Sequence, residues 1–465
     1  MLTSTNPATG LVLEQYPALQ AEELNDRINQ AADAWPGWNL ARMNLRSKVM
    51  MAVAEKLRDQ TQELAELMAL EMGKPIRQGR REVAQAIECV EYFANQAAVY
   101  LGSEHVDTSP DSGSESPRDH YVTYQPIGPV LGVVDASEPV WQAFRFLAPT
   151  LMAGNTCVLK HAAQVQGTAN LIVELIQQVC GRMKVPDARI VVNLPIADSE
   201  VAAAIRHPAI QGLSFAGSSP VGAQLAAVAA SAIKRTVLQL SGSDACIVMA
   251  DGDLEQAVDM ALQSRMKNSG QSGLAVKRVL VEAPVYQQVI ELLKQRMAKL
   301  QVGDPLLQDS DIGPIARQEL LNTLQHQVTA SIAAGAKCLL GGEPLARPGF
   351  YYPPTLLVDV QPGMPAFDEE TFGPVLAVTC VDTFEQALAV ANQTRYGLAA
   401  SIWTRTPRNK RQAILNLQAG QVAINGMVKT DPRLPSGGIK QSGYGRELGP
   451  QGIREFTNAK QVWVG

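Results

Sequence analysis

The chain has 465 residues, of which 46% are hydrophobic and 18% are charged, and its net charge is -5. This balance is typical of a globular protein with two or three domains, and it excludes the basic footprint of a nucleic-acid-binding protein. The first residues carry neither a basic start nor an apolar core, and no apolar run approaches the roughly 20 residues that cross a bilayer. We therefore expect a cytoplasmic protein with no nucleic-acid partner and no membrane partner.

The cysteines and histidines give no sign of a metal site or of a disulfide framework. The six cysteines form no CxxC pair, and the five histidines lack the spacing of metal ligands. Reduced, buried thiols are the expected state of widely spaced cysteines in such a chain. The six are Cys89, Cys157, Cys180, Cys246, Cys338 and Cys380.

The first hundred residues predict three helices, because apolar residues recur at steps of three and four. We expect these helices over 21–35, 45–71 and 76–100, with the Gly-Lys-Pro sequence at 73–75 separating the last two. The composition then shifts to Ser, Asp, Pro and Gly over 102–118, which predicts a loop, and 120–125 alternates like a strand.

From Pro129 onward, short apolar strands alternate with helices, which predicts an α/β domain with a parallel sheet buried on both faces. Ligands of such sheets bind at the carboxyl ends of the strands. Gly217, Ser218 and Gly222 lie between a predicted strand and a predicted helix, where backbone N–H groups can approach a diphosphate. Taken by itself, this loop is better explained as a structural turn.

Segments along essentially the whole chain resemble the aldehyde dehydrogenase superfamily, and most closely its succinate-semialdehyde dehydrogenase-like branch. The matching segments are NPATG, EMGKP, AGNTCVLKHA, FAGSSPVG, GQSG, YYPPTLL, FDEETFGPV and GGIKQSGYGRELGPQGIREFTNAK. The resemblance implies an α/β fold with a Rossmann-type dinucleotide-binding domain (1–103 and 129–239) and an α/β catalytic-type domain (240–445). It also implies a β oligomerisation arm (104–128 and 446–465) and hence a homodimer or homotetramer.

The resemblance further implies a dinucleotide site that is retained. NAD-specific relatives carry a glutamate three residues after a lysine that contacts the adenosine ribose, and here Ala163 stands three residues after Lys160. Without that negative charge a 2′-phosphate is not repelled, so NADP is expected as well as NAD. The positions that the resemblance places on the cofactor are Lys160, Ala163, Gly217, Ser218, Gly222, Glu370 and Phe372.

Three positions that carry the chemistry in the family have other residues here. The family's nucleophilic cysteine falls at Gly273, its general-base glutamate at Gln239 and its oxyanion-binding asparagine at Ser137. Glycine cannot form a covalent intermediate, and a neutral amide cannot take a proton from water. From these positions we expect thiol-dependent aldehyde oxidation to be lost.

Three hypotheses follow for the activity. The first is repurposed chemistry on a small molecule, such as NAD(P)H-dependent reduction of a carbonyl or imine or a non-redox reaction, with Asp135 and Glu138 as new acids. The second is a non-catalytic nucleotide-binding, regulatory or structural subunit. The third is residual NAD(P)-dependent oxidation of an aldehyde or semialdehyde by a displaced thiol, although no cysteine lies in the matching segment.

Further residues near the expected site admit two explanations each. Arg145, Lys429 and Arg433 could attract an acidic substrate, but solvated or structural basic residues are more common. Ser272 lies beside Gly273, and a packing role explains it better than a nucleophilic one, because no base is evident nearby. The sequence leaves the substrate undecided.

Overall fold

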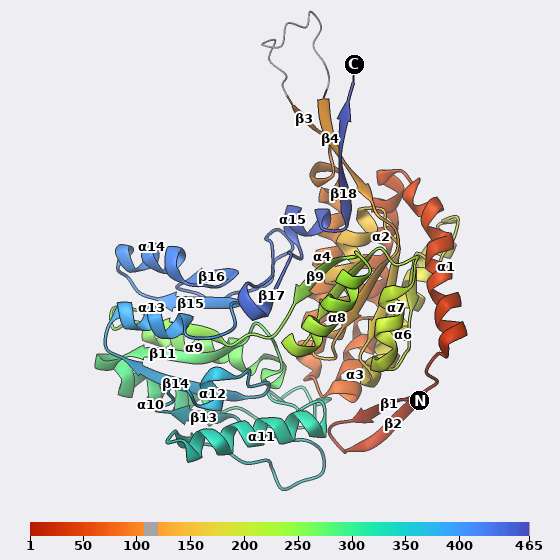
Figure 1. Cartoon of the computed structure of the whole chain (residues 1–465). Coiled ribbons are helices and arrows are strands. Elements are labelled where there is room, and N and C mark those ends of the chain that lie inside the picture. Colours follow the sequence, from red (N-terminus) through yellow and green to blue (C-terminus); the bar gives the residue numbers. More distant parts are fainter. Residues whose placement is uncertain (107–119, 465) are drawn as a thin grey trace, which may run out of the picture.

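The protein consists of two α/β halves, each built around one large sheet, with a narrow β arm projecting from them (Figure 1). This computed structural model describes residues 1–106 and 120–464. Helices pack against both large sheets, and the predicted α/β class is confirmed. Within the described residues, no helix is both long enough and apolar enough to cross a bilayer.

The sheet of the first half has six strands in the order β17-β9-β8-β5-β6-β7. All neighbouring pairs are parallel except β17 with β9, and strands β5, β6 and β8 are buried along their whole length. The strands are β5 (Val130–Val134), β6 (Cys157–His161), β7 (Val191–Asn193), β8 (Gly212–Ala216), β9 (Arg235–Gln239) and β17 (Gly443–Tyr444).

Helices from the first half of the chain surround this sheet. They are α1 (Ala21–Asn39), α2 (Met43–Asp59), α3 (Thr61–Met72), α4 (Ile76–Tyr100), α5 (Pro139–Met152), α6 (Gln166–Arg182), α7 (Val201–Arg206) and α8 (Ser219–Ser231). The prediction of one helix over 45–71 is wrong, because α2 ends at Asp59, α3 begins at Thr61, and Gln60 separates them. The hydroxyl of Thr61 donates to the carbonyls of Leu57 and Arg58, which satisfies the end of α2 and allows the break.

The sheet of the second half has seven strands in the order β12-β13-β14-β11-β10-β15-β16, and only β12 runs antiparallel to its neighbour. The strands are β10 (Asp244–Val248), β11 (Val276–Glu282), β12 (Lys337–Leu340), β13 (Thr355–Val358), β14 (Val375–Val381), β15 (Ala399–Trp403) and β16 (Gln421–Ile424). The helices are α9 (Leu254–Met266), α10 (Tyr286–Met297), α11 (Gln318–Ala333), α12 (Pro365–Asp368), α13 (Phe384–Asn392), α14 (Pro407–Asn416) and, towards the arm, α15 (Gly449–Arg454).

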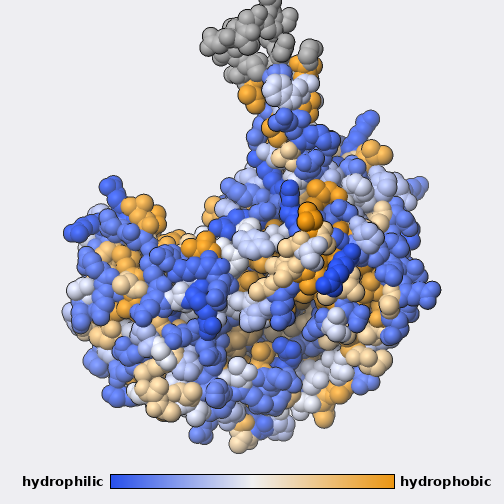
Figure 2. Space-filling model, in the orientation of Figure 1, coloured by the Kyte–Doolittle hydropathy of each residue, from blue (hydrophilic) through white to orange (hydrophobic). Residues whose placement is uncertain are grey.

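The arm joins β3 (Glu104–Val106), β4 (His120–Pro126) and β18 (Thr457–Trp463) in an antiparallel sheet. The predicted loop is therefore wrong over 104–106, whereas 107–118 lies outside the described residues. Hydrophobic side chains are exposed on the arm, including Val106 and Trp463, and Figure 2 shows hydrophobic surface on it and below it. A separate two-stranded sheet pairs β1 (Leu2–Asn6) with β2 (Leu11–Tyr16).

Tight packing of α5 on β5 leads to a stability prediction at Gly132. A Cβ added to Gly132 would lie 2.4 Å from a ring carbon of Phe146, so Gly132→Ala should overpack the core. We expect the free energy of unfolding to fall by about 1–3 kcal/mol, measured by urea denaturation. Gly181→Ala is the matched control, because nothing lies within 4 Å of the added carbon. Equal stability of the two variants would contradict this packing.

Candidate active site

Two cavities meet at the loop that contains Gly273. The first, of about 340 Å³, opens between the two halves at the ends of β5 and β8, and the second has about 500 Å³. Glu138, Ser272 and Leu274 line both cavities. The loop at Gly273 is therefore the wall between the two spaces, and a molecule in each would meet there.

The first cavity begins at the loop between β8 and α8, where a diphosphate was expected. Gly217 and Ser218 line the cavity, Ser218 is the residue before the first turn of α8, and Pro220 occupies that turn. Gly222 has a packing role, because a Cβ there would lie 2.4 Å from the side chain of Leu240. This close contact between α8 and the segment that follows β9 leaves the first turn of α8, with its free N–H groups, beside the cavity.

The two residues expected at the adenosine end lie on and after β6. Lys160 is buried, and its ammonium group forms an ion pair with the exposed carboxylate of Asp198. Ala163 is half-buried, and the next residue, Gln164, lines the first cavity. Asp198 is thus the acidic group that the structure places against Lys160, a partner that the sequence did not suggest.

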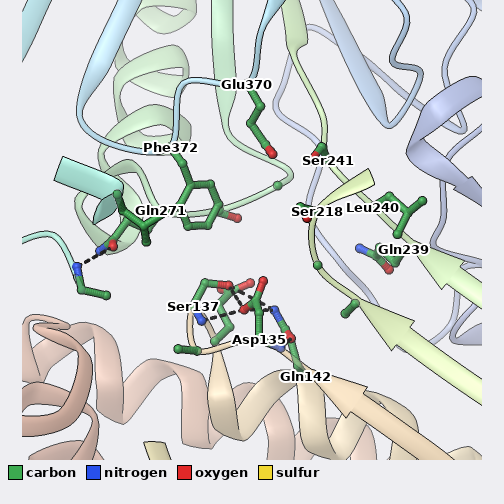
Figure 3. Close-up of a pocket in the computed structure, with 18 of the residues that line it drawn as sticks. Asp135, Ser137, Gln142, Ser218, Gln239, Leu240, Ser241, Gln271, Glu370 and Phe372 are labelled. Carbon is green, nitrogen blue, oxygen red and sulfur yellow. Dashed lines mark hydrogen bonds between the residues drawn. The ribbon is translucent and has the colours of Figure 1, made fainter. Parts of the chain in front are cut away.

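Glu370 and Phe372 line the opposite end of the first cavity, as Figure 3 shows. Glu370 accepts a hydrogen bond from the backbone of Gly242 at 3.1 Å, and its carboxylate lies 3.4 Å from the ammonium of Lys277. Lys277 is fully buried and also donates to the carbonyls of Ser272 and Gly273. It ties the Gly273 loop to Glu370, a role that the sequence analysis missed.

The backbone at Gly273 does not require glycine. Gly273 does not adopt a positive φ, and a Cβ there would meet only Leu398, at an ordinary contact distance of 3.4 Å. The residues before it are more constrained, since Asn268 and Ser269 have φ of 53° and 55°. A Cβ at position 273 would therefore fit without strain at the wall of the first cavity, which Gly273 lines.

Across the first cavity from Glu370 and Phe372, Asp135 is held in a fixed orientation (Figure 3). Its Oδ1 accepts hydrogen bonds from the backbone and hydroxyl of Ser137, at 2.7 and 2.6 Å, and from the amide of Gln142 at 3.0 Å. The Ser137 hydroxyl proton is therefore committed to Asp135. Desolvation raises the pKa of Asp135, although these hydrogen bonds oppose the change.

Glu138, the second acid singled out in the sequence, is held in an ion pair. Its carboxylate lies 2.6 Å from the ammonium of Lys267. Burial opposes ionisation of Glu138, but the charges of Lys267 and Lys74 outweigh it and lower the pKa to about 2. Glu138 is therefore an ionised, paired group on the wall between the cavities.

Gln239 bridges a buried ion pair at the side of the first cavity. Arg145 lies 2.7 Å from Glu447, and the Gln239 amide, when turned so that its nitrogen faces Glu447, donates to that carboxylate and accepts from Arg145 at 3.1 Å. The charge of Arg145 is thus already neutralised. Lys429 lines the second cavity, whereas Arg433 pairs with Asp431 and lines neither cavity.

The thiols lie away from both cavities. Each of the six cysteines is among the described residues, and none of them lines the first or the second cavity. Burial raises the pKa of Cys246 to about 11, and it raises that of Cys180 to about 12. The chain therefore presents no displaced thiol at the site.

The comparisons with known proteins agree with one another along the whole chain. The Aldehyde dehydrogenase family profile matches residues 1–462. A probable succinate-semialdehyde dehydrogenase [NADP(+)] of Synechocystis sp. is 42% identical, covering 100% of this chain and 99% of the relative. Succinate-semialdehyde dehydrogenase [NADP(+)] 1 of Mycobacterium ulcerans is 39% identical with 100% of both covered.

A solved structure extends the likeness to the fold. The succinic semialdehyde dehydrogenase of Streptococcus pyogenes, crystallised with NADP+, superimposes with a TM-score of 0.94 at 29% identity, with 100% of both chains covered. The expected aldehyde dehydrogenase-like α/β fold is thereby confirmed.

These comparisons correct the functional prediction. Relatives that match from end to end are named as NADP-dependent semialdehyde dehydrogenases, so the predictions of lost aldehyde oxidation, of repurposed reduction or non-redox chemistry and of a non-catalytic role are wrong. They depended on single positions, above all Gly273, and a missing side chain excludes one route but not the overall reaction. The retained alternative, NAD(P)-dependent semialdehyde oxidation, agrees with the relatives. The chain belongs to the aldehyde dehydrogenase family.

Proposed function

We propose that this protein is an NADP-dependent dehydrogenase that oxidises a small aldehyde, of the semialdehyde class, to the carboxylic acid. One observation carries the proposal: full-length relatives at 38–42% identity are named for this reaction. The site supports it, because a cavity of about 340 Å³ joins the β8–α8 loop to Glu370 and Phe372.

The residues that face the expected cofactor fit a dinucleotide phosphate. The first turn of α8 offers N–H groups for the diphosphate. Lys160, which is paired with Asp198, lies at the proposed ribose end, and Ala163 itself places no carboxylate against a 2′-phosphate. Glu370 offers carboxylate oxygens for ribose hydroxyls at the other end. When bound, the cofactor supplies a nicotinamide ring that accepts a hydride.

The second cavity is the proposed route for the aldehyde. It reaches the first cavity at Ser272 and Leu274, on the side of the loop away from the β8–α8 turn. Its lining includes Arg81 and Lys429, which can attract the carboxylate of a semialdehyde, whereas Lys267 is paired with Glu138. We also propose that Gly273, Gln239 and Ser137 stand where the family carries cysteine, glutamate and asparagine.

The exposed hydrophobic side chains of the arm support a homo-oligomer. Val106, Trp463 and Val464 are each at least 45% exposed in the isolated chain, and apolar area of this kind is commonly buried between subunits. A homodimer or homotetramer assembled through the arm is therefore part of the proposal.

The experiment that tests the proposed function compares substrates and cofactors. Formation of NADPH from NADP+, or of NADH from NAD+, is followed by absorbance with succinate semialdehyde and with butanal, which lacks the carboxylate. We expect the highest kcat/KM for the semialdehyde with NADP+. Equal rates for both aldehydes would contradict the semialdehyde assignment, and oxidation with NAD+ only would contradict the cofactor.

A further inference from the structure

The proposed reaction needs an oxygen on the aldehyde carbon before hydride can leave, and no thiol is present to build that centre covalently. Gly273 has no side chain, and none of the six cysteines lines either cavity. Aldehydes in water are in equilibrium with their hydrates, whose carbon already bears two hydroxyl groups. A hydrate therefore needs only a base for one hydroxyl proton and an acceptor for the hydride.

We propose that the protein oxidises the hydrate of its aldehyde directly, with the carboxylate of Asp135 as the general base. This inference rests on the proposed function and specifies the form of the substrate and the residue that takes its proton.

Asp135 lies where such a base must lie. It directly follows β5, and β5 pairs in parallel with β8, which is followed by Gly217 and Ser218. The carboxyl ends of neighbouring parallel strands meet at one edge, so Asp135 stands beside the cofactor loop. Asp135 and Gly273 both line the first cavity, so the carboxylate and the position that lacks a thiol face the same space.

Asp135 is also the carboxylate of this cavity that is free to accept a proton. Three carboxylates line it, and Glu138 and Glu370 are paired with Lys267 and Lys277, respectively. Over the described part of the chain Asp135 makes no ion pair, and the hydrogen bonds that its carboxylate accepts all fall on Oδ1. Oδ2 is left to accept the proton, while Ser137 and Gln142 act as positioning residues.

The step balances without a covalent enzyme intermediate. One O–H bond of the hydrate breaks and its proton moves to Oδ2 of Asp135. The C–H bond would break with its electron pair leaving as hydride to the oxidised nicotinamide that the bound cofactor supplies, while the oxygen that lost its proton forms a double bond to the carbon. The product is a carboxylic acid whose two oxygens both come from the hydrate, and Asp135 then releases its proton to solvent.

The charged surroundings of Asp135 set the expected pH dependence. Desolvation raises its pKa, Glu138 adds to the increase, and the hydrogen bonds from Ser137 and Gln142 oppose it. The other charges that line the cavity are Arg145, which is paired with Glu447, Glu370, which is paired with Lys277, and Arg317. Because the base must be ionised, kcat/KM should fall as the pH decreases through a pKa above the usual aspartate range.

The residue is tested with Asp135→Asn and Asp135→Glu. The asparagine variant should bind NADP+ with an unchanged Kd in calorimetry but lose about 10²–10⁴-fold in kcat and lose the acidic limb of its pH profile. The glutamate variant should recover part of the rate together with a shifted acidic limb. An asparagine variant with the wild-type rate and pH profile would overturn the role of Asp135.

The substrate form is tested by mixing. Aldehyde added from a dry acetonitrile stock should give NADPH with a lag that follows hydration, monitored by loss of carbonyl absorbance, whereas pre-equilibrated aldehyde should give no lag. Gly273→Cys is the matched control, because the structure accommodates a side chain there. This variant should react with free aldehyde, show an acyl adduct by intact-protein mass spectrometry and be inactivated by iodoacetamide.

The outcomes separate the inference from the proposed function. Wild-type protein that oxidises aldehyde without a lag, carries an acyl adduct or is inactivated by iodoacetamide would overturn hydrate oxidation while leaving the dehydrogenase function intact. Wild-type protein that binds NADP+ but oxidises neither form of the aldehyde would overturn the proposed function itself.

Discussion

Replacing Lys277 with methionine should lower the free energy of unfolding by about 3–5 kcal/mol, which is the usual cost of breaking a buried ion pair from one side. Lys277 is fully buried on β11, where its ammonium faces Glu370 and Asp244 and donates to the carbonyls of Ser272 and Gly273. Methionine has a similar length but no charge, so the two acids lose a common counter-ion and two carbonyls lose their donor.

Urea denaturation of the purified protein measures this effect. Lys337→Met is the matched control, because Lys337 forms a similar ion pair with Asp359 at the surface, where its side chain is 71% exposed. This control should leave the unfolding midpoint unchanged. If Lys277→Met unfolds at the same urea concentration as the wild type, Lys277 does not hold the Gly273 loop and Glu370 together.

Ala163→Glu should convert the cofactor preference from NADP+ to NAD+. The new carboxylate would lie three residues after Lys160, at the proposed position of the 2′-phosphate, and juxtaposed like charges cost several kcal/mol. About 3–4 kcal/mol corresponds to a Kd for NADP+ that is 10²–10³-fold higher. The Kd for NAD+ should change only a few-fold, because NAD+ carries no 2′-phosphate.

Calorimetric titration with each cofactor measures the change in preference, and Ala163→Gln separates charge from size. Glutamine has the same bulk as glutamate, so the neutral variant should retain a clear preference for NADP+. If Ala163→Glu weakens both cofactors equally, the side chain at 163 acts through packing and does not face the 2′-phosphate.

Local patterns in the sequence were enough to predict most of the fold and the position of the loop between β8 and α8. Alternating apolar strands and helices indicated the parallel sheet, and Gly217 and Ser218 do line the cavity at the end of β8. The break between α2 and α3 at Gln60 was not predicted, because the apolar spacing continues across it. Only the hydroxyl of Thr61 marks the end of α2.

The polar partners within the site could not be predicted, because they depend on contacts between distant segments. Gln239 bridges Arg145 and Glu447, whose positions lie 302 residues apart in the chain. Lys277 carried a signal that was missed, since a lysine inside the apolar strand Val276–Glu282 must find a buried partner. Gly273 does line the first cavity, but the consequence drawn from it was overstated, because a missing thiol does not exclude a different route to the same product.

The most direct measurement of the central claim is the stoichiometry of the reaction. Purified protein is incubated with pre-equilibrated succinate semialdehyde and NADP+, and both NADPH and the carboxylic acid product are quantified against heat-denatured protein. We predict one acid formed for each NADPH, with continued turnover beyond one equivalent per subunit. NADPH and acid at the level of the heat-denatured control, from protein that still binds NADP+, would contradict the account.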